Sequence, residues 1–134
     1  MTQTFLHRAT TSLLRRSDGM AAVEFALTVP VLLVSLLGVI EVGRLLWTEN
    51  ALHYAVEDAA RCMALGTCGA GGPAGYAATA APGMTFPSSD FTATTVACGS
   101  QVTASHTFQF LTTLVNFDTL LPGSMTLTAQ SCHP

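Results

Sequence analysis

The sequence is poor in basic residues, and from Cys62 onward it contains neither arginine nor lysine. Nucleic-acid binding depends on cationic side chains that neutralise phosphates. The absence of such side chains from this whole region excludes a nucleic-acid interface there.

Sequence motifs of enzyme active sites are also missing. The chain has no G-x-S-x-G and no H-E-x-x-H motif, and its four histidines are scattered without an evident acid partner. The glycine-rich stretch 69–75 is not followed by G-K-[ST] and follows no apolar strand, which argues against a phosphate loop. We therefore predict a protein that is not an enzyme, with no cofactor and no small-molecule substrate.

Charge is absent from residues 25–40, which form a predominantly apolar run. Extended to residues 20–47, this segment is long enough to cross a hydrocarbon core about 30 Å thick. Arg8, Arg15 and Arg16 precede it. The positive-inside bias therefore predicts a single span in the inner (cytoplasmic) membrane, with the N-terminus cytoplasmic and the C-terminal part periplasmic or extracellular.

Three residues stand out at the head of this span: Gly19, Met20 and Glu24. A carboxylate at the edge of a membrane helix is costly, so it predicts a functional role and a partner charge. The alternative of an unpaired Glu24 that reaches to the interface stays open. A cleaved secretory signal is a second alternative, but Glu24 and the lack of an A-x-A site after the run count against it.

The stretch RRSDGMAAVEFALTVPVLL resembles the N-terminal segment of TadE-like pseudopilins, the minor pilin-like proteins of tight-adherence (Flp-type) pilus systems. In prepilins of this type, a short basic leader ends in glycine and glutamate is the fifth residue of the mature chain. The resemblance implies that a prepilin peptidase cuts after Gly19, so that Met20 becomes the first residue and Glu24 the fifth. It further implies the Tad/Flp pilus platform and sister pseudopilins as partners.

Physical chemistry agrees with this division into leader and mature chain. Cleavage after Gly19 would create an α-amino group on Met20, with an ordinary pKa near 7.7–8.0. This amine lies about one helical turn from Glu24, and a neighbour's amine could take the same role. Farther along, Pro30 has no N–H for the Ala26 carbonyl, which predicts a bend in the membrane helix.

Beyond the span, residues 48–66 read as an amphipathic helix. Apolar residues recur at helical spacing at Leu52, Ala55, Val56, Ala59, Ala60 and Met63. We expect one continuous helix over residues 20–65, ended by Gly66 as a C-cap. Residues 67–87 are rich in glycine, proline and alanine, which predicts a linker with little regular structure.

The remaining residues, 88–134, are rich in β-branched and aromatic side chains. Segments 91–97, 101–110 and 124–131 read as three strands, and residues 112–123 as a loop or short helix. The predicted fold class is α+β: a long membrane-spanning helix continues into an amphipathic stalk, packed by a small three-stranded antiparallel sheet that covers its apolar stripe.

All four cysteines lie in the region predicted to be exported: Cys62, Cys68, Cys98 and Cys132. An oxidising compartment and a small core favour two disulfides. We favour helix-to-sheet bridges, Cys62 with Cys132 and Cys68 with Cys98, because they close long loops, and all three connectivities remain open. A metal site with His106 or His133 is a rival that lacks the usual ligand spacing.

The resemblance, with which these patterns agree, implies a pseudopilin or minor pilin, a structural or assembly component of a Tad-type pilus that serves adhesion. Its domains would be a cytoplasmic leader (1–19), a transmembrane helix (20–47), an amphipathic helix (48–66), a linker (67–87) and a disulfide-stapled β domain (88–134). The alternative is an uncleaved single-pass envelope protein that anchors a small exported binding module.

Overall fold

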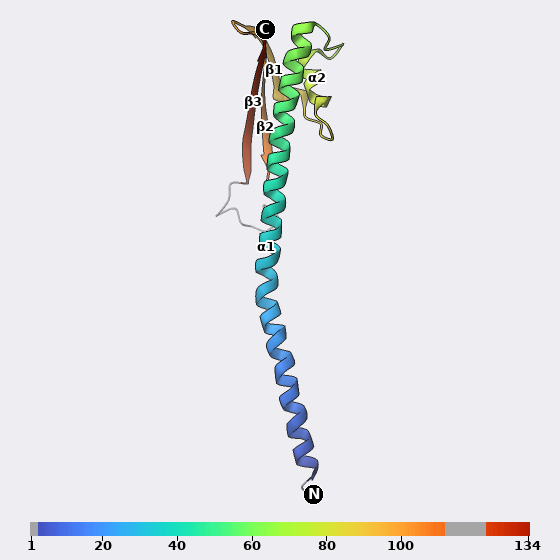
Figure 1. Cartoon of the computed structure of the whole chain (residues 1–134), viewed down its shortest axis with the longest axis vertical. Coiled ribbons are helices and arrows are strands. Elements are labelled where there is room, and N and C mark those ends of the chain that lie inside the picture. Colours follow the sequence, from blue (N-terminus) through green and yellow to red (C-terminus); the bar gives the residue numbers. More distant parts are fainter. Residues whose placement is uncertain (1–2, 112–122) are drawn as a thin grey trace. The chain divides into compact units, whose positions relative to one another are not determined.

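The computed structural model describes residues 3–111 and 123–134, with side chains from Gly19 onward. The elements follow the order α1 (Gln3–Leu65), α2 (Gly72–Ala80), a 3-10 turn (Ser88–Asp90), β1 (Phe91–Val96), β2 (Gly99–Gln109) and β3 (Ser124–His133) (Figure 1). The predicted α+β class is confirmed: a long apolar helix precedes a small antiparallel sheet. The chain divides into two compact units, Met1–Ile40 and Glu41–Pro134.

In the first unit, α1 presents apolar side chains with nothing packed on them. From Gly19 to Ile40 every described side chain is exposed except Val29, which is half-buried. The part of α1 over Gly19–Leu65 is long and apolar enough to cross a membrane, with a mean hydropathy of 2.3 in its most apolar stretch. An apolar surface of this size in water would be unfavourable, so the helix fits a single-pass membrane protein.

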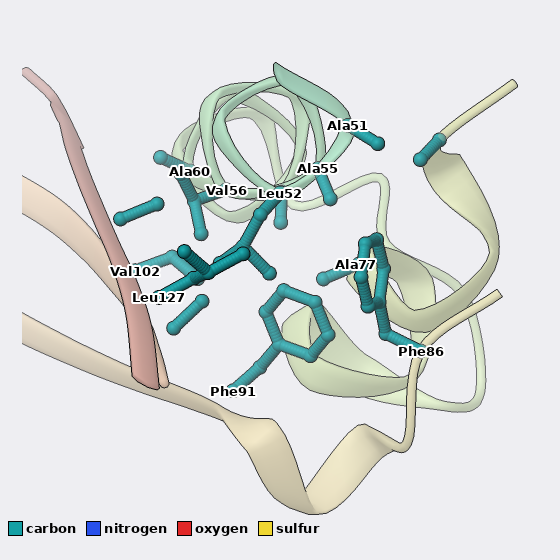
Figure 2. Close-up of a cluster of buried hydrophobic side chains, with 14 of the residues drawn as sticks. Ala51, Leu52, Ala55, Val56, Ala60, Ala77, Phe86, Phe91, Val102 and Leu127 are labelled. Atoms are coloured by element: carbon teal, nitrogen blue, oxygen red, sulfur yellow. The ribbon is translucent and has the colours of Figure 1, made fainter. Parts of the chain in front are cut away.

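In the second unit, the remainder of α1 buries the stripe that its periodicity predicts. Leu52, Val56 and Ala59 have exposed fractions of 0–1%. Figure 2 shows Leu52, Val102 and Phe91 converging between α1, the sheet and α2. Met63, the last residue of the predicted stripe, is only half-buried. Full burial of a Leu, Val or Phe side chain is worth about 1.5–3 kcal/mol, so burial of this stripe stabilises the unit.

The sheet has the strand order β1-β2-β3, with both pairs antiparallel. Its register pairs Phe91 with Ala104 in one direction and Ala104 with Ala129 in the other. On β2, Val102, Ala104 and Phe108 are buried whereas Ser105, Thr107 and Gln109 are exposed. The period-two alternation therefore places one apolar face on the helix, as predicted, and the strands end within one or two residues of the predicted positions. The predicted loop or short helix at 112–123 lies almost entirely outside the described residues.

The end of α1 confirms Gly66 as a C-cap. Gly66 has a φ of +68°, and its N–H donates to the Met63 carbonyl at 3.2 Å. The Thr67 N–H donates to the Cys62 carbonyl at 2.9 Å. This pair of bonds is the Schellman motif, which glycine adopts without steric cost.

The segment between Gly66 and β1 differs from the prediction, because α2 occupies much of it. A nine-residue helix is too short to be stable by itself, so glycine and proline content alone did not indicate it. Pro73 lies in its first turn, where a missing N–H costs nothing. Ala77 is fully buried, and the Tyr76 hydroxyl donates to Asp58 of α1 at 2.8 Å. Packing against the core thus stabilises a helix that the local sequence only permits.

Candidate functional site

The residues predicted to carry processing lie together on α1. Gly19 and Met20 are both exposed, Met20 with 78% of its surface accessible. A side chain added at Gly19 would meet no atom within 4 Å. No contact among the described residues therefore requires a glycine at position 19, and its role in recognition by a peptidase stays a prediction.

Glu24 lies one turn farther along and is exposed as well. The Thr28 hydroxyl donates to the Glu24 backbone carbonyl at 3.0 Å, but no described side chain bonds or pairs with the Glu24 carboxylate. Six residues on, Pro30 lies inside α1 with the helix continuing on both sides. Whether Pro30 bends the helix stays a prediction.

A second acid, Glu41, lies at the other end of the uncharged run and differs from Glu24 in its burial and in its hydrogen bonds. It is 5% exposed. The Arg44 guanidinium donates to both of its oxygens at 3.1 Å, and the Leu111 backbone N–H donates to one of them at 2.6 Å. Arg44 also lies over the Phe108 ring, 5.2 Å from its centroid. This Glu41 cluster joins α1 to the end of β2.

The Glu41 cluster is not predicted by the sequence patterns. Its only local signal is an acid and an arginine three positions apart, directly after the apolar run. Two further polar pairs were also missed: Tyr76 with Asp58, and His106 with Asp90 at 2.6 Å. Each joins segments that are distant along the chain, and periodicity does not predict such contacts.

The four cysteines form two disulfides, but the favoured pairing of helix with sheet is wrong. Cys62 bonds Cys68, with their Cα atoms 5.0 Å apart, and Cys98 bonds Cys132, with theirs 6.4 Å apart. The Schellman turn at Gly66 folds the chain back so that Cys68 reaches the helix end. The β2–β3 register pairs Cys132 with Gln101, which brings it beside the turn that holds Cys98. Local geometry decided the pairing, and loop length did not.

The metal alternative finds no ligand set in the part of the chain that the structure describes. No three His, Cys, Asp or Glu side chains gather there in a way that could hold an ion. All four cysteines are taken up by the disulfides.

Comparison with known proteins gives one result, and it falls on the predicted segment. Residues 19–61 match the family model described as TadE-like protein. This segment is TadE-like. The match begins at Gly19 and includes Met20, Glu24 and Glu41, so it covers both acids and the predicted boundary. The TadE-like segment indicates a component associated with the Tad pilus.

The match ends before Cys62, so neither disulfide nor any strand lies in the TadE-like segment. No curated protein and no solved structure matches the chain. The assignment therefore depends on the helix and not on the sheet.

Proposed function

We propose that the protein is a pseudopilin or minor pilin of a Tad-type pilus, matured by a prepilin peptidase that cuts between Gly19 and Met20. The observation that carries the proposal is Glu24: an exposed carboxylate at the head of an apolar helix, with no partner among the described side chains. A charge in that position is costly unless it is paired. Cleavage at Gly19 supplies the missing partner.

The cut converts an amide nitrogen into the α-amino group of Met20, which is largely cationic at neutral pH. That amine lies four residues before Glu24, within reach of its carboxylate on the same helix face or on a neighbouring subunit. Pairing lowers the cost of holding both groups at the membrane edge. An uncut chain has no amine there, so only mature subunits would assemble.

The bond to be cut lies inside α1. A peptidase needs an extended backbone, so the helix has to open locally around the Gly19–Met20 bond. Ser17, Asp18 and Gly19 are all poor helix formers, glycine by about 1 kcal/mol relative to alanine. A weak stretch at this point makes such opening easier.

In this proposal the chain is a structural component of the inner membrane with its C-terminal unit exported. The prepilin peptidase is a transient partner, and the pilus platform and sister pseudopilins are lasting ones. The apolar helix lies in the lipid bilayer, where its exposed side chains are solvated.

The test is a set of variants in the native host. Gly19→Arg should remain uncut, because a bulky cation replaces a residue without a side chain. Glu24→Ala should be cut normally but fail to assemble, with Glu49→Ala as the matched control, since Glu49 is an exposed acid on the outer part of the same helix. Immunoblots report cleavage, and co-isolation with sheared pili or with the platform reports assembly. Normal assembly of Glu24→Ala would contradict the role of this acid.

A further inference from the structure

The end of the second unit that carries the Glu41 cluster exposes large apolar side chains. They come from three places: the start of this unit's helical part, the second residue after β2, and the beginning of β3. We call them the rim, and it consists of Val42 (56% exposed), Leu46 (51%), Trp47 (60%), Leu111 (49%) and Met125 (46%), with Arg44. Figure 1 shows β2 ending and β3 beginning at the same end of the sheet, and the register pairs Met125 with Phe108, which lies under Arg44.

Arg44 is the cation of the rim and is only partly used. Its Nη1 donates to Glu41, and 42% of its side chain is exposed. No described acceptor bonds its Nε or Nη2. A guanidinium with free donors is suited to bind a phosphate group, often through two parallel hydrogen bonds.

The position of the rim along the chain indicates what covers it. Glu24 and Glu41 lie 17 residues apart, about 26 Å along a helix, which is close to the thickness of a hydrocarbon core. Val42, Leu46 and Trp47 therefore follow directly on the apolar surface assigned to lipid. Tryptophan is enriched at the level of lipid headgroups, because its ring is apolar and its N–H is polar.

We propose that the rim is a lipid-binding surface, seated in the headgroup layer of the leaflet at the exported end of the span. Arg44 binds a phospholipid phosphate, Trp47 lies in the same headgroup layer, and Met125, paired with the Phe108 that lies under Arg44, lies beside them. The exported unit thus rests on the bilayer by its sheet end, and the Glu41 cluster holds that end to the helix. This inference rests on the membrane-spanning helix of the proposed function.

A second copy of the chain is the main rival occupant. Symmetric contact between two rims would enclose the unbonded Nε and Nη2 donors of both Arg44 guanidinium groups, and the described rim residues offer no side-chain acceptor for them. Glu41 offsets the charge of Arg44 but is buried and already accepts three hydrogen bonds. Burying donors without acceptors is costly. Lipid phosphate supplies those acceptors, so we favour the lipid surface.

Trp47 is the only tryptophan in the chain, so its fluorescence reports on the rim without any substitution. The full chain is reconstituted into vesicles of phosphatidylcholine and phosphatidylglycerol, brominated either just below the headgroup or near the end of the acyl chain. We expect strong loss of Trp47 fluorescence with the shallow bromines and weaker loss with the deep ones. Stronger loss with the deep bromines, or no loss with either, would overturn the proposal.

A pair of variants extends the test to the sheet. In a Trp47→Phe background, Met125→Trp places the probe in the rim, and Val96→Trp places it at the opposite end of the sheet. Both native side chains are similarly exposed, at 46% and 41%. The Met125→Trp probe should be quenched by shallow bromines, and the Val96→Trp probe by aqueous acrylamide only. If the bromines quench the native Trp47 but do not quench the Met125→Trp probe, the sheet end does not contact the bilayer, and this part of the proposal is wrong.

Vesicle flotation separates this proposal from the one on which it rests. A chain that floats with vesicles but shows no bromine quenching of Trp47 retains its span and lacks a lipid-seated rim. A chain that does not float with them contradicts the membrane-spanning helix itself. Quenching that weakens as the protein-to-lipid ratio rises would show that a second copy covers the rim instead.

Discussion

The two compact units of this chain use similar residues for opposite purposes. In residues 25–40, the leucines and valines of α1 other than the half-buried Val29 are 47–72% exposed, whereas Leu52 and Val56 of the same helix are 0–1% exposed. The acids differ in the same way: Glu24 has no partner among the described side chains, and Glu41 accepts three hydrogen bonds. The first unit leaves these groups exposed. The second satisfies Leu52, Val56 and Glu41 by contacts within the unit.

Because of this difference, we expect substitutions in the two units to have different effects. Changes in the second unit should lower its stability, because partners inside the chain lose a contact. Changes in the first unit should leave that stability intact and alter processing or assembly. A substitution in the first unit that lowers the stability of the second unit would contradict this division.

The largest loss of stability is expected when an acid is placed in the buried stripe, where no described hydrogen-bond donor faces it. Val56→Asp puts a carboxylate where Val56 is 1% exposed, so it should cost about 4 kcal/mol or more. Glu57→Ala, one residue along on the exposed side, should stay within about 0.5 kcal/mol of the parent. Urea denaturation followed by limited proteolysis of the full chain in detergent measures both. Equal resistance of Val56→Asp and the parent would show that the stripe is not core.

The disulfides should differ according to the length of the loop that each closes. Cys98 and Cys132 are separated by 34 positions and Cys62 and Cys68 by 6. The loop-entropy estimate gives about 4 kcal/mol for the first bridge and about 2 kcal/mol for the second. Cys98→Ser should therefore destabilise the unit more than Cys68→Ser, as measured by the same urea titration. Mass spectrometry of nonreduced peptides checks the pairing itself, and a peptide linking Cys62 to Cys132 would contradict it.

Removing each acid in turn compares the two units directly. Glu41→Ala leaves the Leu111 N–H and the Arg44 guanidinium without their acceptor, which should cost about 1–3 kcal/mol. Glu24→Ala should not change the stability of the second unit, since no described side chain contacts its carboxylate. Matched urea titrations of the two variants test this. A loss of stability in Glu24→Ala similar to that in Glu41→Ala would remove the distinction between the acids.

The smallest effect concerns Tyr76, whose hydrogen bond to Asp58, together with the charge of that carboxylate, raises its pKa above the ordinary value of 10.0. Because the folded-state pKa is the higher one, the bond's contribution is complete below about pH 10 and is lost as the pH rises through the folded-state pKa. Asp58→Asn should bring the Tyr76 pKa back toward its ordinary value, whereas Glu57→Gln should not. A titration of the tyrosine ring resonances by NMR measures the difference, and an unshifted Tyr76 in the parent would contradict it.

The sequence predicts those parts of the fold that repeat at short range. The helical spacing from Leu52 to Ala60 and the alternation around Val102 and Phe108 are visible in a few consecutive residues, and both are confirmed. The Gly66 C-cap is likewise encoded by one residue and its neighbours.

The features that sequence reading missed depend on contacts between distant segments. The bond from Leu111 to Glu41 joins positions 70 apart. The helix α2 needs the core around Ala77 to be stable, and the disulfide pairing follows from the turn at Gly66 and the register of β3. At the candidate site, the roles of Gly19, Met20 and Glu24 stay predictions from the sequence, whereas the buried partner of Arg44 was not predicted.

The mass of the intact protein extracted from membranes shows directly whether residues 1–19 are removed. We expect the chain to begin at Met20 when the prepilin peptidase is present and to retain residues 1–19 when the peptidase is deleted. A chain that still carries Met1 to Gly19 in the presence of an active peptidase would contradict it, and would favour an uncleaved envelope protein that anchors an exported binding module.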